Sequence, residues 1–187
     1  MRVLGIAGSL RRASYNRGLL RAAAGALPPG ARLEVWDGLA AVPPYNEDAD
    51  REPAPEGARA LRAAIERSDA VLIATPEYNG TLPGQLKNAI DWASRPYPDN
   101  VLQRKPVAAI GTSTGLYGAV WAQADARRAL GIAGARVLDR ELAVPLAPHQ
   151  FGSGGELTDA SIRAVLEDIL RGLLDLAVAR REAVAAA

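Results

Sequence analysis

The sequence predicts an α/β fold in which a five-stranded parallel sheet lies between two layers of helices. Apolar runs alternate with helical patterns five times along the 187 residues. The runs at 71–74 and 107–110 lack polar alternation, which is typical of parallel strands covered on both faces. A chain of this length buries most of its apolar surface as one unit. We therefore assign residues 1–187 to a single domain with a three-layer α/β/α sandwich.

The alternating pattern places each element in turn. The first unit consists of a strand near 2–7 and a helix at 15–26. The other expected elements are strands at 32–36, 70–75, 106–112 and 135–138, and helices at 57–67, 83–94, 117–130 and 159–181. In the last helix, apolar residues from Ile162 to Leu174 recur at a spacing of three and four, which predicts a stripe packed on the sheet. Its outward face mixes charges of both signs, which disfavours a membrane-surface helix.

Composition excludes several kinds of site. Cysteine is absent, so disulfides, thiolate metal sites and a cysteine nucleophile are excluded. The chain has one histidine, His149, which argues against a histidine-rich metal site and against a Ser-His-Asp triad. We expect no metal centre. His149 is most simply an ordinary loop residue, although it could also line the mouth of a site.

The charge balance indicates a small-molecule partner. The chain carries 22 basic and 21 acidic residues, so it has no general attraction to nucleic acid or to an anionic membrane. No apolar run is long enough for a membrane span, and Met1 leads directly into the first strand. We therefore expect a cytoplasmic protein with no nucleic-acid or membrane partner.

Residues 8–16, with the sequence GSLRRASYN, connect the first strand to the first helix. A glycine turn at a helix N-terminus directs backbone N–H groups to one point, which favours an anion such as phosphate. The candidate donors are Ser9, Ser14, Asn16 and either Arg11 or Arg12. The first 33 residues contain six arginines and no acid, so nothing nearby opposes a doubly negative group. The alternative is a polar surface turn with a good helix cap.

Three unusual loops follow the first, third and fourth strands, at 8–16, 75–81 and 111–118. In a sheet of order 2-1-3-4-5 these strands are neighbours, so the loops meet at their carboxyl ends, where doubly wound sheets bind ligands. The first loop can hold phosphate, and Tyr78, Asn79 and Ser113 can face a flat polar heterocycle. This arrangement points to a mononucleotide.

Residues 76–95, with the sequence PEYNGTLPGQLKNAIDWASR, are more specific than the dinucleotide and Walker A fingerprints, neither of which is met. We expect Thr81 to cap the following helix and Pro83 to lie in its first turn. A well-capped helix alone would explain the residues from Thr81 onward. It would not explain an exposed Pro-Glu-Tyr-Asn, in which Tyr78 is better interpreted as a platform against a ring.

These two motifs together resemble the NADPH-dependent FMN reductase family, whose flavodoxin-like members include bacterial quinone, chromate and azo-dye reductases. The resemblance spans nearly the whole chain and implies FMN as cofactor and NADPH or NADH as co-substrate. It implies that the FMN phosphate is held by Ser9, Arg11, Ser14 and Asn16. It places Pro76, Glu77, Tyr78, Asn79 and Gly80 at the border of the isoalloxazine, and Ser113, Gly115 and Gly118 beside the flavin and ribityl chain, with Gln123 following.

One departure from the family is visible at Ala119, where the family often has a second glycine. An alanine there could tighten the turn or alter nicotinamide access. The proline-rich stretch 42–56 is unusually long for a loop of a compact domain, and the resemblance places it near a subunit interface. Lys87, Asp91 and Arg95 are most simply an i, i+4 ladder on a solvated helix face, or alternatively part of a cross-subunit ion pair.

We therefore expect an FMN flavoprotein that takes a hydride from NAD(P)H and reduces flavin, quinones or other small oxidised acceptors. The protein is expected to self-associate as a homodimer or homotetramer. Because the cofactor carries the chemistry, no side chain is assigned a catalytic role. The alternative function is a non-enzymatic, flavodoxin-like electron carrier or flavin-sensing module. Such carriers tend to be strongly acidic, whereas this chain has a formal net charge of +1.

Overall fold

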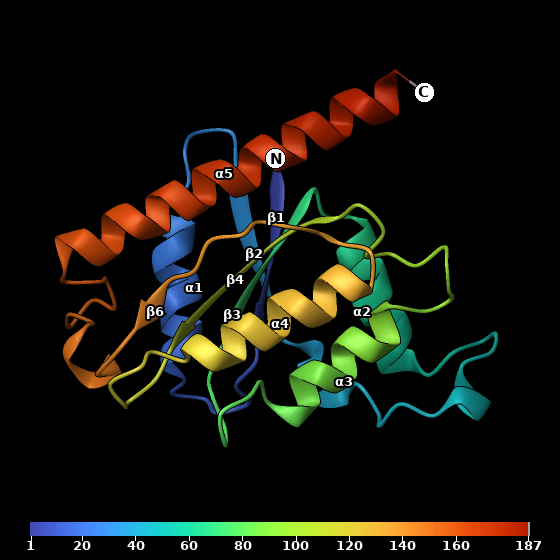
Figure 1. Ribbon diagram of the computed structural model, residues 1–187, viewed down its shortest axis with the longest axis horizontal. Coiled ribbons are helices and arrows are strands. Elements are labelled where there is room, and N and C mark those ends of the chain that lie inside the picture. The colour runs from blue at the N-terminus through green and yellow to red at the C-terminus, as the bar shows by residue number, and fades with distance from the viewer. Residues whose placement is uncertain (187) are drawn as a thin grey trace.

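The computed structural model describes residues 1–186 and contains a central parallel sheet between two helical layers (Figure 1). The five principal strands are β1 (Arg2–Ala7), β2 (Arg32–Trp36), β3 (Ala70–Thr75), β4 (Pro106–Thr112) and β5 (Arg136–Val137). Their order is β2-β1-β3-β4-β5, and every pair of neighbours is parallel. The predicted flavodoxin-like order 2-1-3-4-5 is confirmed.

The helices cover both faces of the sheet (Figure 1). One face packs against α1 (Tyr15–Ala26) and α5 (Ala160–Ala185), and the other against α2 (Glu56–Glu66), α3 (Gly84–Ala93) and α4 (Val120–Ile132). Within β3, Val71 and Ile73 enter the core beneath α2, α3 and α4, whereas Leu72 enters the core beneath α1 and α5. Side chains of one strand thus supply both cores, which explains the continuous apolar run.

The structure differs from the predicted elements mainly at one sheet edge. The fifth strand is split, because β5 pairs with the start of β4 and a short β6 (Ala143–Val144) pairs with its end. Helix α4 begins at Val120, three residues later than expected, because Gly118 and Ala119 adopt left-handed backbone angles. Helix α5 continues to Ala185, beyond the predicted end at 181.

The proline-rich stretch 42–56 packs against α3 and is hydrogen-bonded to it. The short 3-10 helix η1 (Gly38–Ala41) precedes the stretch, and a second one, η2 (Glu47–Ala49), lies within it. Asn88 accepts a hydrogen bond from the Tyr45 N–H at 2.7 Å, and both Asn88 and Trp92 donate to the Pro43 carbonyl at 2.8 Å. Because α3 satisfies these backbone groups, the stretch packs as part of the fold.

None of the helices among residues 1–186 combines the length and the apolar character that a membrane span requires. The remaining short element is η3 (Ala147–His149), which contains the single histidine.

A buried lysine joins β4 to the end of α2. The Lys105 side chain is 2 % exposed, and its Nζ donates to the carbonyls of Ile65 at 2.8 Å and Ser68 at 2.6 Å. Burial, the largest influence, and the charge of Arg180 lower the pKa of Lys105 to about 8, so the amine is mostly protonated at neutral pH. A cation at the carboxyl end of a helix is favourably placed to satisfy its last carbonyls.

We predict that Lys105→Met lowers the free energy of unfolding by about 2–4 kcal/mol, because it leaves buried carbonyls without a donor. Urea unfolding at pH 7 measures this. The neighbouring exposed Arg104 is a matched control, and Arg104→Met should change the stability by less than about 1 kcal/mol. Equal stability of the two variants would contradict this role for Lys105.

Candidate cofactor-binding site

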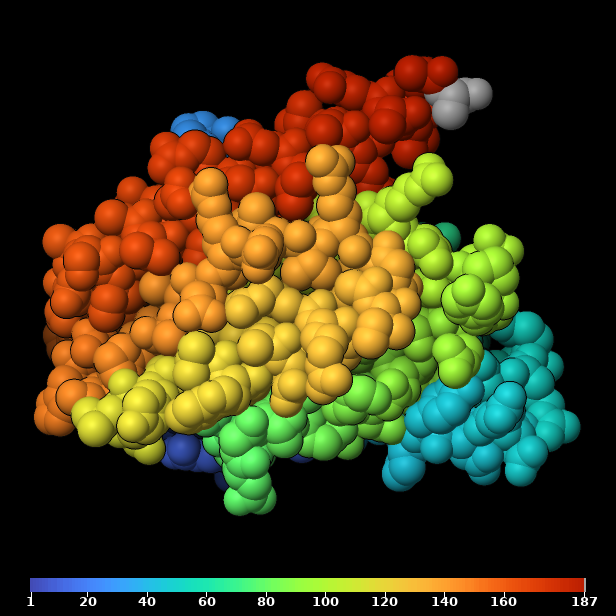
Figure 2. All heavy atoms as spheres, in the orientation of Figure 1, coloured from blue at the N-terminus to red at the C-terminus, as the bar shows by residue number. Residues whose placement is uncertain are grey.

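A cavity of about 110 Å3 lies where the carboxyl ends of β1, β3 and β4 meet. Its lining consists of Ser9, Arg11, Ser14, Tyr15, Asn16, Pro76, Glu77, Tyr78, Thr112, Ser113 and Thr114. These residues come from the three loops that the sequence singled out. Figure 2 shows the three segments along one edge of the molecule, in dark blue, green and yellow.

Eight of the twelve predicted site residues line this cavity. They are Ser9, Arg11, Ser14, Asn16, Pro76, Glu77, Tyr78 and Ser113. The other four, which are Asn79, Gly80, Gly115 and Gly118, belong to the same loops but are not part of the lining. Tyr15, Thr112 and Thr114 line the cavity without having been predicted. The sequence pointed to these three residues only in that each stands next to a predicted site residue.

The first loop presents an arginine without a carboxylate partner. Ser14 caps α1, with its Oγ accepting from the Arg17 N–H at 3.4 Å. The side chain of Arg17 is paired with Asp37, whereas Arg11 forms no ion pair among residues 1–186. Arg11 is exposed and its backbone N–H donates to Ser9 Oγ at 3.4 Å. The loop therefore offers a guanidinium and two hydroxyl groups to an anion.

Asn16 fastens the first loop to the third. Its Nδ2 donates to the Thr112 carbonyl at 3.0 Å, and its Oδ1 accepts from the Thr112 N–H at 3.1 Å. The side chain is buried, and both groups of its amide are used in this clamp. Of the four residues assigned to the phosphate, Asn16 thus has the least capacity left for a ligand.

Asn79 and Gly80 shape the second loop. Tyr78 and Thr81 exchange two backbone hydrogen bonds, at 3.0 and 3.2 Å, around a two-residue turn. Asn79 and Gly80 both have positive φ, 52° and 74°, as a type I′ turn requires. The turn leaves the Tyr78 ring 49 % exposed beside the cavity. The two turn residues thus present Tyr78 at the cavity, and their own contact with a flavin stays a prediction.

Thr81 does not cap α3, so that prediction is wrong. The residue before α3 is Pro83, and no side chain caps the helix. Thr81 Oγ1 instead donates to Asp125 Oδ2 in α4 at 2.6 Å. This hydrogen bond, together with the nearby Arg128, holds the pKa of Asp125 below its usual range. The turn at Asn79-Gly80 thus directs the Thr81 hydroxyl toward α4, so the second loop is bonded to α4 and not to the start of α3.

Glu77 caps α4 from the second loop. Its Oε2 accepts from the backbone N–H groups of Trp121 at 2.9 Å and Ala122 at 3.1 Å. The residue at the N-cap position, Ala119, has no side-chain acceptor of its own. Glu77 is the one carboxylate in the cavity lining, and these bonds at the positive end of the helix dipole offset its charge.

The third loop passes closely over β6. At Gly118, which has φ 57°, an added Cβ would lie 2.5 Å from the Ala143 carbonyl carbon, so a side chain does not fit. The buried Gln123 donates to the carbonyls of Gly118 and Ala119 and accepts from the Leu142 N–H at 3.1 Å. Ala119 itself has φ 64°, a conformation that costs a non-glycine residue about 1–2 kcal/mol.

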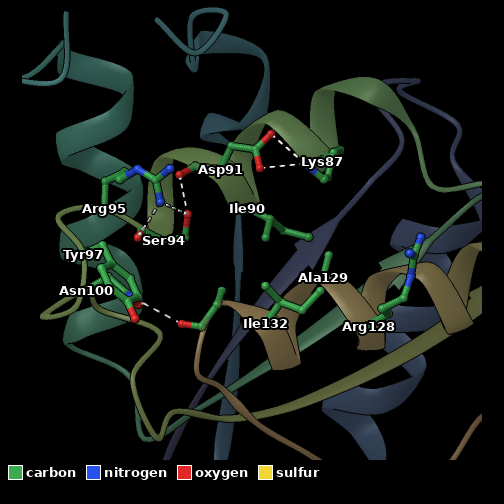
Figure 3. A pocket seen from close by; sticks show the side chains of 11 residues that line it. Lys87, Ile90, Asp91, Ser94, Arg95, Tyr97, Asn100, Arg128, Ala129 and Ile132 are labelled. Carbon is green, nitrogen blue, oxygen red and sulfur yellow. Dashed lines mark hydrogen bonds and ion pairs between the residues drawn. The ribbon is translucent and has the colours of Figure 1, made fainter. Parts of the chain in front are cut away.

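A second, larger cavity of about 480 Å3 lies between α3 and α4, away from the ends of the strands (Figure 3). Ile90 and Ile132 line it together with charged side chains of α3. Lys87 and Asp91 form the predicted ion pair at 2.7 Å. Arg95 departs from the expected ladder, because its Nε donates to the Tyr45 hydroxyl at 3.2 Å instead. Among residues 1–186, no group of three or more potential metal ligands occurs.

Comparisons with known proteins identify the relatives of this chain. The family described as NADPH-dependent FMN reductase matches residues 1–149. An NAD(P)H-dependent FMN reductase of Pseudomonas aeruginosa is 40% identical over 174 residues, which cover 92% of this chain and 93% of that protein. A 2-hydroxy-1,4-benzoquinone reductase of Burkholderia is 43% identical over 127 residues, 68% of each chain. The solved structure of FerB, a flavoenzyme NAD(P)H:(acceptor) oxidoreductase of Paracoccus denitrificans, superposes with a TM-score of 0.85 at 35% identity, covering 94% of this chain and 96% of that one.

We predict that Glu77→Ala lowers the free energy of unfolding by about 1–2 kcal/mol and speeds amide hydrogen exchange at Trp121 and Ala122, because both N–H groups lose their acceptor. Glu77→Gln retains an acceptor oxygen and should lose less. Glu167→Ala, on an exposed face of α5, serves as the control. Unchanged exchange at both amides in Glu77→Ala would show that the cap has no energetic role.

Proposed function

The chain belongs to the NADPH-dependent FMN reductase family, and on that basis we propose that its three-loop cavity holds FMN for the NAD(P)H-dependent reduction of small oxidised acceptors. The chain is an oxidoreductase of the flavoprotein class. Quinone reductases among its relatives favour quinones as acceptors. The reaction class thus comes from the family, and the placement of the cofactor from the geometry of the loops.

The observation that carries this placement is the donor set of the cavity. The lining combines Arg11, which has no ion-pair partner among residues 1–186, with the hydroxyls of Ser9 and Ser14 and the half-exposed Tyr78. The lone carboxylate, Glu77, is engaged by α4. Cation and hydroxyl donors suit a phosphate, and an aromatic face suits the isoalloxazine, so the residues present fit FMN.

The protein groups are expected to act by binding and alignment. FMN, when bound, supplies the hydride-accepting and electron-donating chemistry. Arg11, Ser9 and Ser14 would hold the phosphate, and Tyr78, presented by the type I′ turn, would contact the isoalloxazine. Ser113 and Thr114 of the third loop also line the cavity. No side chain is needed as a proton donor, because an open cavity lets protons arrive from water.

We further propose that the cavity between α3 and α4 and the 42–56 stretch form a two-fold interface with a second copy of the chain, giving a homodimer or homotetramer. Ile132 is 81 % exposed and Tyr97 is 77 % exposed at this cavity, and both would be covered in such an assembly (Figure 3). Hydrogen bonds from α3 already hold the 42–56 stretch in place, so dimer formation would not have to pay the entropy of ordering this stretch.

We predict that Arg11→Ala weakens FMN binding about ten- to a hundredfold, because a charge-assisted hydrogen bond contributes about 1.5–3 kcal/mol. Fluorescence titration of the apoprotein measures this. The variant should bind riboflavin as the wild type does, since riboflavin has no phosphate. Arg12→Ala is the matched control, because Arg12 is exposed and does not line the cavity. Equal wild-type affinities for riboflavin and FMN would refute the phosphate assignment.

The activity itself is tested with the purified FMN-loaded protein. Steady oxidation of NADPH or NADH with a quinone as the sole acceptor is expected, with no protein partner added. A protein that binds FMN tightly and oxidises neither nicotinamide would fit the electron-carrier alternative and would contradict the proposed function.

For the assembly, we predict that Ile132→Glu shifts the protein toward a monomer at micromolar concentration, because the new charge would be buried in the interface. Light scattering reads the mass directly. Val184→Glu, at another exposed apolar position on α5, should leave the mass unchanged. A wild-type protein that is monomeric under these conditions would refute the proposed interface.

A further inference from the structure

Exposed apolar side chains occur on all three loops that line the proposed cofactor cavity. Each of the three cavity loops contributes at least one, and the first turn of α4 contributes another. They are Leu10, Tyr78, Leu116, Tyr117 and Trp121. Isolated exposed apolar residues are ordinary, but a group around a polar cavity marks a binding surface. We define these five residues as the apolar rim.

Two members of the apolar rim form an aromatic pair. The ring centroids of Tyr117 and Trp121 are 5.0 Å apart, with the planes tilted by 57°. Tyr117 is 63 % exposed and Trp121 is 49 % exposed. The pair presents aromatic surface to solvent on the same side of the molecule as the cavity loops. Because hydrophobic stabilisation scales with the apolar area removed from water, the exposed surface of this pair contributes little to the stability of the fold.

The backbone of this pair is anchored to the cavity. The Val120 N–H donates to the Tyr117 carbonyl at 3.2 Å, and the Trp121 N–H donates to Glu77 Oε2 at 2.9 Å. Glu77 lines the cavity. The aromatic pair is therefore held in a fixed relation to the cavity wall before any ligand binds, which lowers the entropic cost of binding.

Trp121 differs from the other two tryptophans in that its side chain lies outside both core clusters. Trp92 is fully buried and donates its indole N–H to the Pro43 carbonyl, and Trp36 packs against a core cluster. Trp121 is instead half-exposed and packs its ring against Tyr117, which leaves an aromatic face available to a planar ring.

We propose that Tyr117 and Trp121 form a stacking platform for the ring of a planar quinonoid acceptor and set the acceptor specificity of the enzyme. This inference rests on the proposed function. Because Trp121 is bonded to Glu77 in the cavity wall, an acceptor that enters the proposed FMN cavity is expected to meet the pair. The overall reaction is NAD(P)H + H⁺ + quinone → NAD(P)⁺ + hydroquinone. The pair takes no electron or proton and acts as a positioning element.

The first test measures binding without turnover. 1,4-Naphthoquinone is titrated into the oxidised, FMN-loaded protein by calorimetry, with no nicotinamide present. Trp121→Ala should raise the Kd about five- to twentyfold, because stacking and contact area are lost. Trp121→Phe keeps a ring and should stay within about threefold of the wild type. Val184→Ala, on the distant end of α5, should have no effect.

The second test separates acceptor contact from a general defect. With NADPH as donor, Trp121→Ala should raise the KM for 1,4-naphthoquinone by a similar factor, while ferricyanide, which has no ring to stack, is reduced at the wild-type rate. An unchanged Kd for naphthoquinone would overturn the proposal. An equal loss with both acceptors would also overturn it, because the side chain would then support the FMN site.

Two further outcomes are distinguishable. If Trp121→Ala lowers the mass seen by light scattering, the apolar rim is covered by a second copy of the chain, and the platform is refuted. If the wild-type protein oxidises no nicotinamide with either acceptor, the proposed function fails. The calorimetric titration still reports on the platform in that case, since it requires no reduction of the flavin.

Discussion

The parallel pairing of β1, β3 and β4 is the constraint on which the candidate site depends. The register pairs Ala7 with Ala74, and Thr75 with Gly111, so the three strands end at the same level of the sheet. The chain leaves β1 with the Gly8 N–H still bonded to the Ala74 carbonyl at 2.8 Å. Three loops therefore start side by side. A change of one residue in the pairing register of any of these strands would turn its side chains to the other face of the sheet.

Polar side chains then join these loops to one another. Asn16 connects the first loop with the end of β4, Glu77 connects the second loop with α4, and Gln123 connects the glycine turn with the sheet edge. Each of these side chains bonds to backbone groups of a distant segment. The cavity walls are therefore built before any ligand binds, so that little binding energy is needed to order them.

The sequence predicted the strands because the evidence for them is local, and their order followed from the doubly wound fold class that the alternating pattern indicates. Short continuous apolar runs such as 71–74 are typical of a parallel strand that is covered on both faces. The roles of single polar side chains depend on tertiary partners instead. Thr81 resembles a helix cap in the sequence, but the turn that precedes it carries its hydroxyl to Asp125. The Asn79-Gly80 pair is a recognised hairpin signal, and it forms a type I′ turn in the structure, while its place at the flavin border stays a prediction.

The most direct test of the account is to locate FMN on the protein. We expect a titration of FMN into the 15N-labelled apoprotein, followed by amide chemical shifts, to perturb residues 8–16, 76–81 and 112–118. The amides along the cavity between α3 and α4, near Ile90 and Ile132, should stay largely unchanged when FMN is added. Perturbations concentrated around Ile90 and Ile132, with the three loops unaffected, would contradict the central claim.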